Sequence, residues 1–234
     1  MKQNPISLSK RLRAAAEFAR ADAYIADVGT DHAYLPLWLL LEGRIRGGVV
    51  SDINEGPIER AREHLAAYGA SDRLSSLLTD GLSALAPYGP EDIFILGMGG
   101  ELIARILSDA PFVKARGVRL ILQPMTHPEL LRAFLCREGF AIVDEVLVKE
   151  EKIYQIMVAE YTGETRTLDE LSLMFGEKNL ARREELLFEL LSRWEGILTR
   201  RKDGKAMAGE SLLEEERLLD LIARYKKGEA YDRS

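Results

Sequence analysis

The stretch YIADVGTDH, residues 24–32, joins a short apolar strand to a polar turn that contains a glycine. Four comparable apolar strands are predicted further along the chain, and helical stretches lie between them. Such alternation is typical of a parallel sheet that is covered by helices on both faces. The five predicted strands span residues 24–28, 48–51, 74–78, 92–96 and 119–122.

Two longer β-runs follow these strands, at residues 141–148 and 153–161, and the polar turn 149–152 joins them. This pattern predicts an antiparallel hairpin at the end of the parallel sheet. Helix boundaries are also marked: Pro57 and Pro128 stand where helices should begin, and Gly69 and Gly139 where they should end. The fold class predicted here is α/β.

The hydrophobic periodicity changes beyond residue 162. Thr167 and Glu170 fit a capping box at the start of a short helix that Gly176 would end. A coiled-coil-like seam then predicts a long helix, and a break at 203–209 predicts a second helix running back along it. We therefore expect two domains, residues 1–162 and 163–234. The seam consists of Leu180, Leu187, Leu191, Trp194 and Leu198.

Composition excludes several protein classes. The 234 residues include 47% hydrophobic and 30% charged residues, as in ordinary globular proteins. The single cysteine, Cys136, excludes a disulfide framework and a multi-cysteine zinc site, and we expect no metal. We find no secretory signal, and the longest apolar run, 33–41, is far shorter than the about 20 residues of a membrane span. A cytoplasmic protein without membrane contact is expected.

The formal net charge is −6, from 32 Lys and Arg against 38 Asp and Glu, so the chain is not a uniformly basic nucleic-acid-binding protein. Basic residues are nevertheless concentrated locally. Residues 1–20 contain five of them against Glu17 alone, a local charge of +4. A second basic group lies in the C-terminal part, where pairing with nearby glutamates on a solvated helix is the alternative explanation. Its members are Arg182, Arg183, Arg193, Arg200, Arg201, Lys202 and Lys205.

Ligands of open α/β sheets bind beyond the carboxyl ends of the strands. Glycine or polar residues follow all five predicted strands, at residues 27–32, 51–54, 79–81, 97–100 and 123–124. Gly29 permits a tight turn and a close approach to a ligand. Asp52, 23 residues further on, suits a ribose diol, and Asp80 could accept a hydrogen bond from an adenine amine.

The first loop lacks the G-x-G-x-x-G pattern of dinucleotide-binding folds. Asp27 and Asp31 would repel a diphosphate but attract a sulfonium cation, which favours S-adenosylmethionine over NAD. Each feature alone has an ordinary explanation: an aspartate after a strand usually caps a helix, and residues 97–100 could form a plain turn. It is their occurrence at all five strand ends that indicates a ligand site.

The chain resembles the bacterial tRNA (adenine(22)-N1)-methyltransferases over nearly its whole length. Two departures from the family pattern are Met125, where many members have Asn, and Gln155, where Glu is commoner. The matching segments are LSKRL (8–12), DVGTDHAYLP (27–36), SDINEGP (51–57), TDGL (79–82), GMGG (97–100), LQP (122–124) and EEKIYQI (150–156).

The resemblance implies a class I, Rossmann-like methyltransferase domain with a helical C-terminal domain. It implies methyl transfer from S-adenosylmethionine to N1 of adenine 22 in the D-arm of tRNA. The products would be 1-methyladenosine in the tRNA and S-adenosylhomocysteine. No metal is implied, because the sulfonium already activates the methyl group. No obligate protein partner is inferred.

Residue roles follow from position and resemblance. Asp31 and His32 are the catalytic candidates. The cofactor-binding candidates are Arg11, Asp27, Gly29, Thr30, Asp52, Ile53, Asn54, Asp80, Gly81, Gly97 and Met98. The substrate-binding candidates are Gly99 and Gly100, which would leave room for the base, with Gln123, Pro124, Tyr154, Arg200, Arg201 and Lys202.

Three alternatives remain open from the sequence. The chain could be a class I methyltransferase that acts on another RNA, a small molecule or a protein. It could be a non-catalytic domain that binds S-adenosylmethionine and recruits a partner through its helical hairpin. An NAD-dependent enzyme is disfavoured by the missing glycines.

Overall fold

The computed structural model describes residues 6–30 and 32–229, and these form two compact units, residues 1–166 and 167–234. The first unit contains a seven-stranded sheet of order β3-β2-β1-β4-β5-β7-β6. Strands β1 to β5 are parallel, and β7 runs antiparallel to both β5 and β6. The strands are β1 Ala23–Val28, β2 Ile45–Asp52, β3 Leu74–Leu78, β4 Asp92–Gly99, β5 Arg119–Thr126, β6 Phe140–Lys149 and β7 Ile153–Tyr161.

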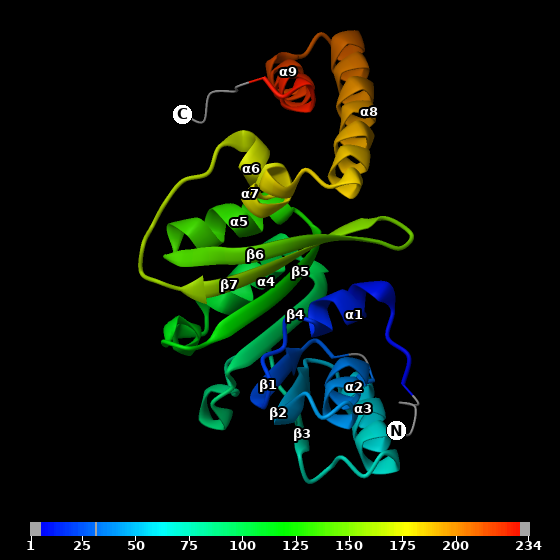
Figure 1. Cartoon of the computed structure of the whole chain (residues 1–234), viewed down its shortest axis with the longest axis vertical. Coiled ribbons are helices and arrows are strands. Elements are labelled where there is room, and N and C mark those ends of the chain that lie inside the picture. The colour runs from blue at the N-terminus through cyan, green and yellow to red at the C-terminus, as the bar shows by residue number, and fades with distance from the viewer. Residues whose placement is uncertain (1–5, 31, 230–234) are drawn as a thin grey trace. The chain divides into compact units, whose positions relative to one another are not determined.

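Helices cover this sheet, as Figure 1 shows, with α2 and α3 beside β1–β3 and with α4 and α5 beside β4–β7. Consecutive residues of β1 and β5 are buried, because both faces of the central strands are covered. This is the Rossmann-like sheet with a terminal antiparallel hairpin that the sequence predicts. The helices are α1 Lys10–Ala16, α2 Tyr34–Leu41, α3 Glu55–Ala67, α4 Gly100–Ser108 and α5 Pro128–Arg137, with short 3₁₀ turns η1 Ala86–Tyr88 and η2 Pro111–Lys114.

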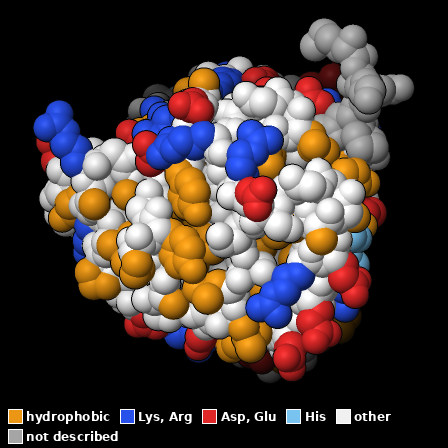
Figure 2. Space-filling view, turned by 90° about the horizontal axis from the view of Figure 1, so that it is seen from below, with side chains coloured by type: hydrophobic (Ala, Val, Ile, Leu, Met, Phe, Trp, Pro, Cys, Tyr) orange, Lys and Arg blue, Asp and Glu red, His pale blue; other side chains and the backbone are white. Residues whose placement is uncertain are grey.

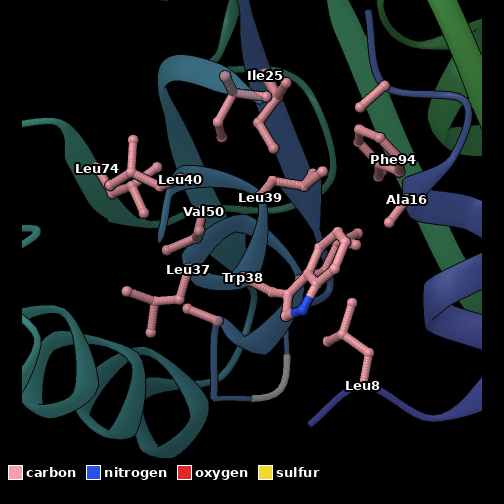
Figure 3. Close-up of a cluster of buried hydrophobic side chains, with 14 of the residues drawn as sticks. Leu8, Ala16, Ile25, Leu37, Trp38, Leu39, Leu40, Val50, Leu74 and Phe94 are labelled. Carbon is pink, nitrogen blue, oxygen red and sulfur yellow. The ribbon is translucent and has the colours of Figure 1, made fainter. Parts of the chain in front are cut away.

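The longest apolar run of the chain forms α2, and residues 35–40 of this helix are all buried. Figure 3 shows Leu37, Leu39 and Leu40 of α2 among side chains of the neighbouring strands, including Ile25 and Val50. A helix that is apolar on all sides belongs inside a core, which explains the composition of the run. Among the described residues, no helix is long and apolar enough to cross a membrane.

Residues 97–100 differ from their expected form. The sequence predicted a strand that ends at residue 96, and a plain turn was the ordinary alternative for the next four residues, but Gly97, Met98 and Gly99 belong to β4 and Gly100 begins α4. Met98 pairs with Pro124, and Gly99 pairs with Thr126, after local irregularities in the register. Strand β4 therefore extends to the first residue of its helix, without an intervening loop.

The second unit contains four helices among its described residues: α6 Glu170–Phe175, α7 Glu177–Arg182, α8 Glu185–Ala208 and α9 Leu213–Lys227. Lys205 pairs with Glu215 at 2.7 Å, and Lys226 pairs with Glu195 at 2.8 Å. These contacts join α8 and α9 in antiparallel order, as expected of a helical hairpin.

Two local predictions in this unit are wrong. The N-cap of α6 is Asp169, whose carboxylate accepts from the Ser172 amide at 2.8 Å, so Thr167 does not form a capping box. Helix α8 continues through Gly204 to Ala208, so the predicted break at 203–209 is confined to the turn that follows Ala208. The Lys205–Glu215 ion pair supports the helix beyond this glycine, which local propensity alone disfavours.

A buried ion pair ties α5 to the terminal hairpin. Arg132 and Glu145 are 0% and 1% exposed, and Arg132 Nε donates to Glu145 Oε1 at 2.7 Å. Arg132 Nη2 donates to Gln155 Oε1 on β7, also at 2.7 Å. Removing one member of such a pair leaves a buried charge without its partner.

We expect Glu145→Gln to lower the free energy of unfolding by about 3–5 kcal/mol, measured by urea denaturation. The matched control is Glu138→Gln, which removes the exposed ion pair with Lys114. That pair should contribute less than about 1 kcal/mol. Equal effects of the two substitutions would contradict a special cost at Glu145.

Candidate active site

The loop after β1 folds back onto the end of β2. The backbone amides of Gly29 and Thr30 both donate to the carbonyl oxygen of Ser51, at 2.8 and 3.0 Å. The Thr30 hydroxyl donates to Asp27 Oδ2 at 2.7 Å. These contacts fix a buried carboxylate, that of Asp27, at the carboxyl edge of the sheet.

Burial raises the pKa of Asp27 to about 6, because the ionised carboxylate loses its hydration. The hydrogen bond from Thr30 opposes this rise, and the negative charge of Asp52 adds to it. Among the described residues, no cationic side chain contributes to this shift in the pKa of Asp27. A positively charged ligand would therefore be attracted to this edge of the sheet.

Gly29 and Met98 bring the ends of β1 and β4 into close contact. Gly29 has a φ of +74°, and a Cβ at this position would lie 2.0 Å from the Met98 methyl carbon. A residue with a Cβ would be strained at this φ, and the flexible end of the Met98 side chain would have to move. Gly97, with a φ of +82°, lies beside the Arg11 guanidinium, whose Nη1 would be 3.7 Å from an added Cβ.

Arg11 connects three distant parts of the chain. Its Nη1 donates to Gln123 Oε1 at 2.7 Å, and its guanidinium carbon lies 5.6 Å from the centroid of the Tyr154 ring. Its backbone amide donates to Glu150 Oε1 at 2.8 Å, at the N-terminus of α1. The structure thus brings together Arg11, Gln123 and Tyr154, all predicted to be site residues. Sequence reasoning missed the role of Glu150, because 139 positions separate it from Arg11.

Two residues predicted to contact substrate are engaged within the protein. Gln123 is buried, and its Nε2 donates to the Pro124 carbonyl at 2.8 Å while its Oε1 accepts from Arg11. Tyr154 is 7% exposed, and its hydroxyl donates to Glu151 Oε2 at 2.9 Å. Pro124 is buried, and the exposed apolar residue at the end of β5 is Met125. These contacts indicate that Gln123 and Tyr154 support the wall of the candidate site.

Gly99 and Gly100 have a packing explanation. A Cβ at Gly100 would lie 2.2 Å from the His127 carbonyl oxygen, and one at Gly99 would lie 3.2 Å from Thr126 Oγ1. The last residue of β5 and the N-cap of α5 therefore occupy the space that side chains would need. Room for an incoming base at these glycines stays a prediction.

The ends of β2 and β3 combine carboxylates with exposed apolar side chains. Asp52 Oδ1 accepts from the amide and the side chain of Asn54, at 2.7 and 3.1 Å. Ile53 is 62% exposed, and Leu78 on the neighbouring strand is also exposed. Asp80 is exposed and follows β3, and Gly81 adopts a positive φ against Ile106. This edge offers hydrogen-bond acceptors next to an apolar surface.

The structure describes only one of the two catalytic candidates. Asp31 lies outside the described residues. His32 is partly buried, and its ring stacks with those of Tyr34 and His64, with 5.3 Å between centroids in each case.

In the second unit, Lys202 pairs with Glu216 at 3.5 Å, whereas Arg200 and Arg201 are exposed.

A methyltransferase-domain family matches residues 8–157 of the chain. The tRNA (adenine(22)-N1)-methyltransferase of Bacillus subtilis is 37% identical over 174 residues, which cover 74% of this chain and 73% of that protein. The resemblance predicted from the sequence motifs is thereby confirmed.

Solved structures agree with this assignment. The Bacillus subtilis m1A22 tRNA methyltransferase is 30% identical with a TM-score of 0.79, and the match covers 93% of this chain and 95% of that one. A Streptococcus pneumoniae protein, solved in complex with S-adenosyl-L-methionine, is 31% identical with a TM-score of 0.82, and the match covers 92% and 99%. The chain belongs to the family of tRNA (adenine(22)-N1)-methyltransferases.

Proposed function

We propose that this protein transfers the methyl group of S-adenosyl-L-methionine to N1 of adenine 22 in tRNA. Membership of the methyltransferase family supports the reaction class. The observation that carries the proposal is the buried carboxylate of Asp27. Burial and the nearby charge of Asp52 both destabilise its ionised form. A cationic cofactor would stabilise that form. The relative from Streptococcus pneumoniae that was solved with S-adenosyl-L-methionine supports the choice of cofactor.

The residues at the sheet edge fit this cofactor. Asp27 is placed to attract the cationic amino-acid portion, and the Asp52 carboxylate can accept hydrogen bonds from a ribose diol. The exposed side chain of Ile53 offers an apolar surface for an adenine ring. Gly97 and Met98 would line the floor near the sulfonium. When bound, the cofactor supplies a methyl group already activated by the positive sulfur.

The task of the chain is then positioning and charge stabilisation. Adenine N1 attacks through its ring lone pair, and the methylated base becomes cationic, so no proton has to leave N1. The protein must align N1 with the methyl group and place negative charge near the base. We assign the negative charge to Asp31 and propose His32 as the second catalytic residue, since both directly follow Thr30, a proposed cofactor-binding residue, in the chain.

The proposed macromolecular partner is tRNA, and the cytoplasm is the proposed compartment. The target adenine must leave its stack to reach the site, and contacts to phosphates should supply most of the affinity. The face drawn in Figure 2 carries Lys and Arg side chains among acidic and apolar ones, so it has charges of both signs. We propose that the exposed Arg200 and Arg201 of α8 contact the RNA backbone. Lys202 is a weaker candidate because it pairs with Glu216.

Methyl transfer from labelled S-adenosylmethionine to unmodified tRNA tests the function directly. Nucleoside analysis should find 1-methyladenosine at position 22, and a tRNA with guanosine at that position should stay unlabelled.

Asp31→Asn should lower turnover by about 100-fold or more, because the developing charge loses its carboxylate. Failure of the wild-type protein on every tRNA tested would contradict the proposed function.

The affinity for S-adenosylhomocysteine should rise with pH between 5 and 7 and level off above. Below its pKa of about 6, Asp27 is protonated and attracts the ligand ammonium less. Well below that pKa the dissociation constant should change by up to about tenfold per pH unit, as measured by calorimetry. Asp27→Asn should weaken binding and flatten the profile, whereas Asp80→Asn should weaken binding and keep the profile. A pH-independent wild-type affinity would exclude this role of Asp27.

In the absence of ligand, the raised pKa of Asp27 makes the free energy of unfolding depend on pH. The pKa of Asp27 is raised from 3.8 to about 6, so the folded chain holds a proton that the unfolded chain has lost in this range. The contribution of Asp27 to the free energy of unfolding therefore falls as the pH rises from 3.8 towards 6. Ligand binding should offset this loss, because it favours the ionised carboxylate.

Reversing the charge at Arg200 and Arg201 should weaken tRNA binding. The R200E/R201E variant should lose affinity at low salt, and the slope of log affinity against log salt should become shallower by about 1–2. Arg116→Glu is a matched control, since this exposed arginine precedes β5 and lies at the opposite edge of the sheet from the site. Unchanged affinity and slope in R200E/R201E would remove these arginines from the interface.

A further inference from the structure

The connection between β1 and α2 has an unusual backbone. His32 and Ala33 adopt φ angles of +64° and +55°, so two consecutive residues other than glycine occupy the left-handed region. Such conformations cost free energy and persist only where the surrounding structure holds them. Ala33 is also the N-cap of α2 and has no side-chain hydrogen bond to the helix. The ordinary capping device therefore does not account for this geometry.

His64, on the neighbouring helix α3, contacts the connection directly. Its Nδ1 lies 2.9 Å from the carbonyl oxygen of His32. A carbonyl oxygen can only accept, so Nδ1 carries the proton and donates it. The His64 ring also stacks on the His32 ring at 5.3 Å and lies 5.2 Å from the Tyr34 ring. His64 thus contacts the residues on both sides of Ala33.

The connection has a second anchor nearer to the cofactor site. The amides of Gly29 and Thr30 donate to Ser51, and Thr30 holds Asp27. In the sequence, residue 31, the proposed electrostatic partner of the target base, comes between Thr30 of this anchor and His32, which His64 contacts. A shift of the His32 backbone would therefore alter the connection that follows Thr30, a proposed cofactor-binding residue.

We propose that His64 is a positioning residue for methyl transfer. Through the His32 carbonyl and the ring stack, it holds the β1–α2 connection in the conformation in which base and methyl donor meet. The effect of this connection on methyl transfer rests on the proposed function. It differs from a purely packing role of His64 within α3, which would affect the stability of the fold rather than the reaction rate.

Two substitutions separate the hydrogen bond from the ring stack. His64→Phe keeps an aromatic ring and removes the donor, whereas His64→Asn keeps an N–H group near the position of Nδ1 and removes the ring. We expect His64→Phe to lower kcat by about tenfold, because small displacements of reacting groups are costly. The KM for S-adenosylmethionine and the Kd for S-adenosylhomocysteine should change less than twofold. His64→Asn should restore most of kcat.

Glu63→Gln is the matched control, because Glu63 is the exposed neighbour of His64 on α3. It should keep kcat, KM and the melting temperature. The proposal is overturned if His64→Phe has the kcat of the wild type. It is also overturned if kcat, cofactor affinity and melting temperature fall together in both variants, which would indicate a packing role only.

Hydrogen–deuterium exchange of the peptide covering residues 29–37 gives a readout that needs no tRNA. Exchange should be faster in His64→Phe and close to wild type in His64→Asn. If the wild-type protein methylates no tRNA, the proposed function fails, while exchange still decides whether His64 holds the connection. Unchanged exchange in His64→Phe would refute that role even in an active enzyme.

Discussion

The site depends on one carbonyl oxygen, that of Ser51, which accepts hydrogen bonds from the amides of Gly29 and Thr30. This pair of bonds folds the first loop over the end of β2 and places Thr30 where its hydroxyl reaches Asp27. The loop in turn brings Gly29 against Met98 at the end of β4. A parallel register that aligns Val28 with Ser51 is the condition for all of these contacts.

Much of the fold was readable from the sequence because its signals are local. Strand β3 and strand β7 begin and end where the apolar runs do, and Pro128 opens α5 as expected. The errors arise where long-range contacts override local preference. The strand was predicted to end at residue 96, before the glycines at 97 and 99, but pairing with β5 extends β4 through them. Gly204 suggested a break, but ion pairs with α9 support the helix around it.

The candidate site was predictable by position more than by contact. Strand order places the residues after β1, β2 and β4 at one edge, which the alternation of elements already implies. Which side chains face a ligand depends on partners elsewhere in the chain. Gln123 and Tyr154 lie at the expected place, yet Arg11 and Glu151 already engage their polar groups. Glu150 and His64 make their hydrogen bonds with residues that lie far away in the sequence.

The position of β7 between β5 and β6 constrains how the chain is made. Strand β7 comes last in the sequence of the sheet but lies inside it, so β5 keeps an open edge until residues 153–161 have left the ribosome. Arg11 is synthesised early, but its contacts with Glu150 and Tyr154 form only at that late stage. A nascent chain that ends before β7 therefore lacks one wall of the site and exposes a strand edge that could aggregate.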